Sequence, residues 1–159
     1  MGIHMRSVKY YSFPDRYRDS AQFPCPDYPT KLKRSVMIRK IVGGLEGLLT
    51  ALSTVSDQKK TFIYFIGDRN ASGESWCPDC RDSDPVVSQA LKDLEHLDVS
   101  FVTCEVGDKP YWKDPNNGFR NTEKLRISSV PTIIQWNTDR RISDADCCSI
   151  EKVKEFLSE

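Results

Sequence analysis

The chain has 159 residues, of which 38% are hydrophobic and 29% charged, the size and composition of one ordinary globular domain. Its 23 basic and 23 acidic side chains cancel, which excludes an overall field that would attract nucleic acid or an anionic membrane. No apolar run approaches the roughly 20 residues of a membrane-spanning helix, and the first residues lack the apolar stretch of a secretory signal. We therefore expect a protein that is neither membrane-bound nor exported.

Residues 1–36 differ in character from the rest of the chain. They contain seven Lys or Arg against three Asp, and three prolines lie within residues 23–29. No helical or strand periodicity runs through them, so we predict an irregular, disordered N-terminal extension before a folded domain at residues 37–159. An organelle transit peptide and translated sequence upstream of Met37 are alternative explanations for this extension.

The rest of the chain alternates segments typical of strands and of helices. β-branched and aromatic runs predict strands at residues 36–42, 61–66, 99–106, 132–136 and 140–142. The continuous run 61–66 is expected at the centre of the sheet, buried on both faces. Apolar residues at helical spacing predict helices at residues 45–55, after Trp76–Cys80, near residues 119–125, and at the end of the chain, where Ile150, Val153 and Phe156 or Leu157 are apolar. This order predicts an α/β fold, with a central mixed β-sheet flanked by helices on both faces.

Two cysteines, Cys77 and Cys80, follow the predicted central strand. Cys77 falls at the start of a helix, where free backbone N–H groups and the helix dipole favour a thiolate, and Cys80 follows one turn later. A thiolate attacks a disulfide far better than a thiol does, so we predict Cys77 as the nucleophile and Cys80 as the resolving thiol of a disulfide reductase. Pro78 favours the helix start, and the charge of Asp79 is expected to oppose ionisation of Cys77 modestly.

The main alternative for this pair is half of a zinc site, which needs two further Cys or His ligands at a suitable spacing. The available partners are poor, because His96 falls on a helix, Cys147 and Cys148 are adjacent, and Cys25 lies in the extension. Cys104 is expected to be a small buried side chain of a strand, and Cys147 and Cys148 are expected to flank a turn, although the sequence assigns no role to them or to Cys25. With no export signal, six cysteines fit a reducing compartment.

Three motifs of this chain resemble motifs of the thioredoxin superfamily. They are the WCPDC run Trp76–Cys80 after a strand, Pro85 five residues beyond Cys80, and Val130–Thr132 before a later strand. Together with VGDKPYWKDPNN at residues 106–117, the WCPDC run is similar to the thioredoxin domain-containing protein 17 family over about residues 37–159. The resemblance implies a thioredoxin fold and a cytoplasmic thiol-disulfide oxidoreductase.

The same resemblance implies the redox partners. No cofactor is bound, and electrons come indirectly from NADPH through thioredoxin reductase. The implied substrates are small disulfides such as cystine, selected protein disulfides, persulfides and nitrosothiols, and a dynein light chain is an implied partner. We expect a monomer with no nucleic-acid, membrane or metal partner. The alternative function is a redox-sensitive binding protein that regulates a signalling pathway with little turnover.

The resemblance also implies a substrate-binding face. Pro131 corresponds to the cis proline opposite the active site, where the backbone at Val130 pairs with an extended substrate. The remaining residues of this face are in the active-site motif: Trp76, Pro78 and Asp79. A trans proline that opens an edge strand is the alternative reading of Pro131.

One position departs from thioredoxin, which has a buried Asp in the strand before its active site where this chain has Tyr64. Asp84, one helical turn beyond Cys80, is a candidate base for the resolving thiol, and a solvated helix carboxylate is the alternative. The loop at residues 67–75 is longer than in thioredoxin. We expect it to cover one side of the site and exclude large protein substrates, or else to be a plain surface insertion.

Overall fold

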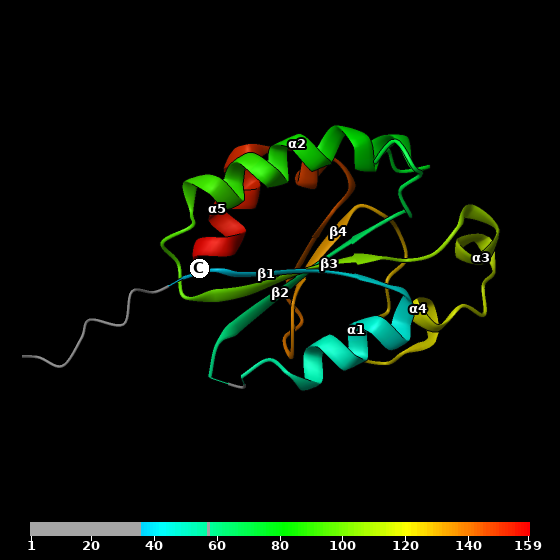
Figure 1. Cartoon of the computed structure of the whole chain (residues 1–159), viewed down its shortest axis with the longest axis horizontal. Coiled ribbons are helices and arrows are strands. Elements are labelled where there is room, and N and C mark those ends of the chain that lie inside the picture. The colour runs from blue at the N-terminus through cyan, green and yellow to red at the C-terminus, as the bar shows by residue number, and fades with distance from the viewer. Residues whose placement is uncertain (1–35, 57) are drawn as a thin grey trace, which may run out of the picture. The chain divides into compact units, whose positions relative to one another are not determined.

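The computed structural model describes residues 36–56 and 58–159 (Figure 1). The elements follow in the order β1 (Ile38–Gly43), α1 (Gly44–Ser53), β2 (Lys60–Ile66), α2 (Pro78–Asp93), β3 (Val99–Glu105), α3 (Lys109–Lys113), α4 (Gly118–Asn121), β4 (Thr132–Gln135), β5 (Arg141–Ser143), the 3-10 helix η1 (Asp144–Cys148) and α5 (Ile150–Ser158). The predicted alternation of strands and helices, and with it the α/β class, is confirmed.

The five strands form one mixed sheet in the order β1-β3-β2-β4-β5. β1 and β2 both pair with β3 in parallel, whereas β4 is antiparallel to β2 and to β5. The predicted central place of the run at residues 61–66 is confirmed, since β2 lies between β3 and β4. Every residue of that run is buried, as expected for a strand covered on both faces.

Alternate side chains of β2 point to opposite faces of the sheet. Phe62 packs edge-on against Phe156 of α5, with ring centroids 5.7 Å apart, and the Tyr64 hydroxyl reaches α2. The next residue, Phe65, points to the opposite face and packs against Phe119 of α4, with ring centroids 5.9 Å apart. α2 and α5 therefore cover one face of the sheet, and α1 and α4 lie on the other, as Figure 1 shows.

Short elements differ from the sequence prediction. The loop after β3 contains the helix α3, and the helix expected at residues 119–125 is the single turn α4. Cys147 and Cys148, expected to flank a turn, belong to the 3-10 helix η1. Side-chain caps start α3 and α4, because Asp108 accepts from the Tyr111 N–H and Asn117 accepts from the Arg120 N–H. Such local hydrogen bonds leave no trace in apolar periodicity.

The predicted N-terminal extension falls almost entirely outside the described residues, so its disorder and the boundary at residue 37 stay predictions. In the described part, Met37 is buried and belongs to the hydrophobic core, and β1 begins at the next residue. Among the helices of that part, none combines the length and the apolar character that crossing a membrane requires.

Candidate active site

The two cysteines and the Val130–Pro131 bond meet at the end of the sheet where β2 finishes. Thr132, the first residue of β4, pairs with Phe65 near the end of β2, because the two strands are antiparallel. This register brings the peptide just before β4 next to the start of α2. The Cys77 thiol and the Val130 carbonyl oxygen are 53 positions apart in the sequence and 3.4 Å apart in space.

Cys77 is the N-cap residue of α2, and Pro78 begins the helix. Proline fits there because the N–H it lacks would have no partner within the helix. The backbone N–H of Cys77 donates to Ser75 Oγ at 3.2 Å, and the Ser75 hydroxyl donates to the Gly67 carbonyl at 2.7 Å. The Cys77 thiol is therefore fixed at the positive end of the α2 dipole, the place that the sequence predicts for it.

The two thiols have unequal surroundings. Cys77 keeps 5% of its surface exposed, whereas Cys80 is fully buried. Burial raises the pKa of Cys80 well above its ordinary value, and the adjacent Cys77 thiol and the charge of Asp84 raise it further. Both thiols are free. A substrate therefore reaches the sulfur of Cys77 first, which favours the predicted order of attack without testing it.

The Val130–Pro131 peptide bond is cis, as the resemblance implies. Its Val130 carbonyl accepts from the Cys77 thiol, so this backbone directly faces the redox pair. The next carbonyl, that of Pro131, accepts from the Asp144 N–H at 2.8 Å, and the Cys147 thiol lies 3.7 Å from it and 3.6 Å from the Ile142 carbonyl. η1 therefore supports the cis-proline segment, a role that the sequence did not indicate.

Trp76 is anchored to the loop after β3. Its indole N–H donates to the Gly107 carbonyl at 2.9 Å, and the Gly107 N–H donates to Asp68 Oδ1 at 2.6 Å. The backbone N–H of Trp76 also donates to the Asp68 carbonyl. Within the loop at residues 67–75, Arg69 and Ser75 form an isolated antiparallel bridge. The loop is thus tied to Trp76 and to the segment after β3, and its expected role as a cover of the site stays a prediction.

Asp84 lies in a polar network behind Cys80. Its Oδ1 accepts from the Tyr64 hydroxyl at 3.1 Å and its Oδ2 from the Arg69 guanidinium at 2.9 Å. No hydrogen bond joins Asp84 to Cys80 in the described part, although the Asp84 charge acts on the thiol. Sequence reasoning missed Arg69 and Ser83, whose hydroxyl lies 2.6 Å from that of Tyr64. Because a buried tyrosine hydroxyl needs a hydrogen-bond partner, Tyr64 in the central strand was the feature of the sequence that could have indicated this network.

A family model for the thioredoxin domain of thioredoxin domain-containing protein 17-like proteins matches residues 42–159. The chain belongs to this family. It is 45% identical to thioredoxin domain-containing protein 17 of Mus musculus over 101 residues, which are 64% of this chain and 80% of that protein. The Danio rerio protein of the same name is 41% identical over 107 residues, 66% and 85% of the two chains. Thioredoxin-like protein Clot of Arabidopsis thaliana is 33% identical over 98 residues, 60% and 72%.

Membership of the thioredoxin domain-containing protein 17-like family confirms the resemblance read from the sequence. The sheet and the flanking helices are accordingly those of a thioredoxin fold. Membership also supports a redox function of the oxidoreductase type for the Cys77 and Cys80 pair, which the matched residues include.

The remaining cysteines of this family member are not equivalent. Burial raises the pKa of Cys104 and of Cys147 to about 12, so both stay neutral thiols at physiological pH. Cys148 is exposed, and its sulfur lies 3.9 Å from the carbonyl oxygen of Asp79 at the start of α2. Slight burial and the nearby Asp82 and Asp79 raise the pKa of Cys148 as well. Cys25 lies outside the described residues.

A structural zinc site needs four ligands, mostly Cys and His, close together in space. Within residues 36–56 and 58–159, no three His, Cys, Asp or Glu side chains come together as a metal site would require.

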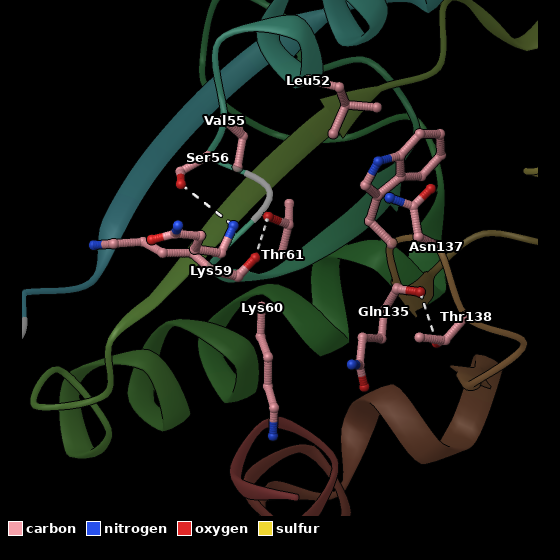
Figure 2. Close-up of a pocket in the computed structure, with 11 residues that line it drawn as sticks. Leu52, Val55, Ser56, Lys59, Lys60, Thr61, Gln135, Asn137 and Thr138 are labelled. Carbon is pink, nitrogen blue, oxygen red and sulfur yellow. Dashed lines mark hydrogen bonds between the residues drawn. The ribbon is translucent and has the colours of Figure 1, made fainter.

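A pocket of about 260 Å³ lies at the opposite end of the sheet, between the end of α1, the start of β2 and the turn after β4 (Figure 2). The Thr138 hydroxyl donates to the Gln135 carbonyl at one side of this pocket. Its lining includes no cysteine, so it is separate from the redox pair.

Proposed function

We propose that the chain is a disulfide reductase that uses the Cys77 and Cys80 dithiol. One observation carries the proposal: the Cys77 thiol, at the N-terminus of α2, faces the Val130 carbonyl of the cis-proline segment, while Cys80 is buried one helical turn behind it. A substrate disulfide that pairs with the Val130 backbone would present its sulfur to Cys77. Trp76, Pro78, Asp79 and Pro131 surround this position and complete the proposed substrate face.

The proposed reaction has two thiol-disulfide exchanges. In the first, the Cys77 thiolate attacks one substrate sulfur, a Cys77–substrate disulfide forms, and the other substrate sulfur leaves as a thiolate that takes up a proton. In the second, Cys80 loses its proton and attacks the Cys77 sulfur. The Cys77–Cys80 disulfide forms, the mixed disulfide breaks, and the second substrate thiol is released. Two electrons pass from the dithiol to the substrate.

Because burial holds Cys80 in its neutral form, the second exchange needs a proton acceptor. Asp84 is our candidate base, since it lies four residues after Cys80 on the same face of α2. The proton of Cys80 would pass to the Asp84 carboxylate, which is one-quarter exposed, and from there to water.

The substrates and the source of electrons are proposed from family membership. We propose cystine and other small disulfides, persulfides, nitrosothiols and selected protein disulfides, a dynein light chain among them, as substrates. We propose NADPH through thioredoxin reductase as the electron source, no bound cofactor, and action as a monomer in the cytoplasm. The loop at residues 67–75, held onto the site by Trp76 and Asp68, supports a preference for small substrates.

The proposal is tested by an assay that couples NADPH oxidation to thioredoxin reductase, with cystine and insulin compared as substrates. We expect turnover with a preference for cystine, complete loss of activity in Cys77→Ser, and accumulation of mixed disulfides in Cys80→Ser, because only the resolving step is then missing. Cys148→Ser is the matched control, since Cys148 is an exposed cysteine near the start of α2 but outside the redox pair.

Mass spectrometry identifies the trapped adduct and the cysteine that carries it. Equal loss of activity in both variants with no adduct would contradict the assigned order of attack. Stable binding of a protein partner without turnover would instead favour the redox-sensitive regulatory protein.

A further inference from the structure

Arg69 connects three segments around the redox pair. It belongs to the loop before Cys77, and its guanidinium bonds to Asp84 of α2 at 2.9 Å and to Glu105 of β3 at 3.0 Å. The side chains of all three residues are about one-quarter exposed. A planar guanidinium can hold two carboxylates in fixed directions, which a lysine ammonium cannot do as well. Arg69 therefore fixes the direction of the Asp84 carboxylate relative to both the loop and the sheet.

Tyr64 of β2 holds the Asp84 carboxylate from the side of the sheet. It is 1% exposed, and its hydroxyl donates to Asp84 Oδ1 at 3.1 Å and lies 2.6 Å from Ser83 Oγ. Burial raises the pKa of Tyr64 far above its ordinary value, so the hydroxyl stays a neutral donor. Ser83 in turn donates to the Cys80 carbonyl at 3.1 Å. The sheet thus contacts α2 one turn after Cys80 through two linked hydroxyls.

The Asp84 carboxylate has unoccupied acceptor positions for a proton even while Tyr64 and Arg69 hold it. An ionised carboxylate has about four acceptor sites, and Tyr64 and Arg69 occupy one on each oxygen. A groove of about 440 Å³, lined by Tyr64, Arg69 and Asp84 together with residues of β1, β3 and α2, connects the carboxylate to solvent. The other charged residues that line this groove are Arg69 from the loop and Arg39 and Lys40 from β1, and Glu105 of β3 pairs with Arg69.

We propose that Tyr64 and Arg69 are positioning residues for the resolving step, holding the Asp84 carboxylate where it accepts the proton of Cys80. This rests on the proposed reductase function. In the step, the Cys80 S–H bond breaks, the proton passes to Asp84 and then to water, and the Cys80 sulfur forms a bond to Cys77 as the Cys77–substrate bond breaks. Tyr64 and Arg69 exchange no proton themselves.

The test is a stopped-flow reaction of the reduced protein with Ellman's reagent, which needs neither a physiological substrate nor a recycling enzyme. Cys77 attack releases the first chromophore and Cys80 resolution the second, so each step has its own phase. Cys25 and Cys148 are replaced by serine throughout, so that the redox pair alone reports. We expect Tyr64→Phe and Arg69→Met to slow the second phase roughly tenfold at neutral pH, part of the general-base contribution, and to spare the first phase.

A double-mutant cycle separates positioning from structure. In an Asp84→Asn background, adding Arg69→Met is expected to change the second phase by less than about twofold, because the group that Arg69 positions is already absent. Arg69→Lys should recover part of the rate, and the slowing should diminish at high pH, where hydroxide removes the Cys80 proton. Arg140→Met is the matched control, since Arg140 also pairs with a carboxylate, Glu159, away from the redox pair.

Equal slowing of both phases overturns the proposal, as does the same effect of Arg69→Met with and without Asp84. Thermal melting shows whether Arg69→Met folds. If it does not, Tyr64→Phe, which keeps the buried ring, tests the proposal instead. A protein that shows both phases but no turnover with NADPH and thioredoxin reductase would contradict the proposed electron source and leave this proposal standing. Absence of both phases would overturn the reductase function and, with it, this proposal.

Discussion

At the scale of single residues, Gly67 determines how closely the loop approaches the active-site tryptophan. A Cβ at this position would lie 2.5 Å from the Trp76 ring and 2.9 Å from Ser75 Oγ, closer than any real contact. We expect Gly67→Ala to displace both side chains, to lower the free energy of unfolding by about 1–3 kcal/mol, and to reduce cystine reduction. Denaturant unfolding and the coupled assay measure the two effects.

Gly43→Ala is the control for this prediction, because a Cβ there meets nothing within 4 Å. Its unfolding free energy and activity should stay close to those of the unsubstituted protein. Equal effects of the two substitutions would show that the contact with Trp76 is not what requires glycine at position 67.

The same scale shows where sequence reasoning stops. The places of Cys77 and Pro78 at the start of α2 were predicted, because a strand, a loop and a cysteine pair follow each other directly in the sequence. Arg69 was missed, since a single arginine in a polar loop has no distinguishing pattern. Its importance comes from carboxylates 15 and 36 positions away that only the folded sheet and α2 bring to it.

At the scale of elements, α5 packs on the sheet through three buried side chains, of which Phe156 is the aromatic one. Phe156 contacts Phe62 edge-on, and the Arg140 guanidinium lies over the Phe156 ring, 4.9 Å from the ring centroid. We expect Phe156→Ala to cost about 3–5 kcal/mol of unfolding free energy, because it removes a buried ring and leaves a cavity. Glu155→Ala, on the exposed side of the same helix, should stay within about 0.5 kcal/mol in the same denaturant titration. Similar losses in the two variants would contradict this packing.

The elements also differ in how well the sequence predicts them. β2, α2 and α5 have long apolar patterns, and their observed positions agree with the prediction. α3, α4 and η1 are only four or five residues long. An element of this length has too few residues to show a periodicity, and its formation depends on caps and on packing against the rest of the chain.

At the scale of the whole molecule, the folded domain should not depend on residues 1–36. We expect a variant that begins at Met37 to keep its melting temperature and its activity nearly unchanged, because β1 begins at Ile38 and the family match at residue 42. Thermal melting and the coupled assay test this. A large fall in either would make the N-terminal segment part of the working structure.

The buried thiols predict how stability depends on pH. Burial raises the pKa of Cys104 and Cys147 to about 12 from an ordinary value of 9.0. Because the pKa of each thiol is higher in the folded protein than in the unfolded chain, its contribution to the unfolding free energy is fully present below pH 9.0. As pH rises from 9 toward 12, the unfolded chain releases the proton first, and this contribution is lost. We expect the unfolding free energy, measured with reductant, to fall by about 1.4 kcal/mol per pH unit for each thiol in this range. A Cys104→Ala, Cys147→Ala double variant should show a shallower fall, and an identical slope would contradict the assignment.

The sequence by itself determined the order of the strands and of the long helices, the central place of β2, and the redox pair on one turn of α2. These depend on residues close together in the chain, whose spacing follows from the geometry of strands and helices. Only the tertiary structure decided that the Val130 carbonyl accepts from the Cys77 thiol, that η1 supports Pro131, and that Tyr64 and Arg69 hold Asp84. Those contacts join distant segments, and they exist because β4 runs antiparallel to β2 and because α2 packs across the sheet face from which Tyr64 projects.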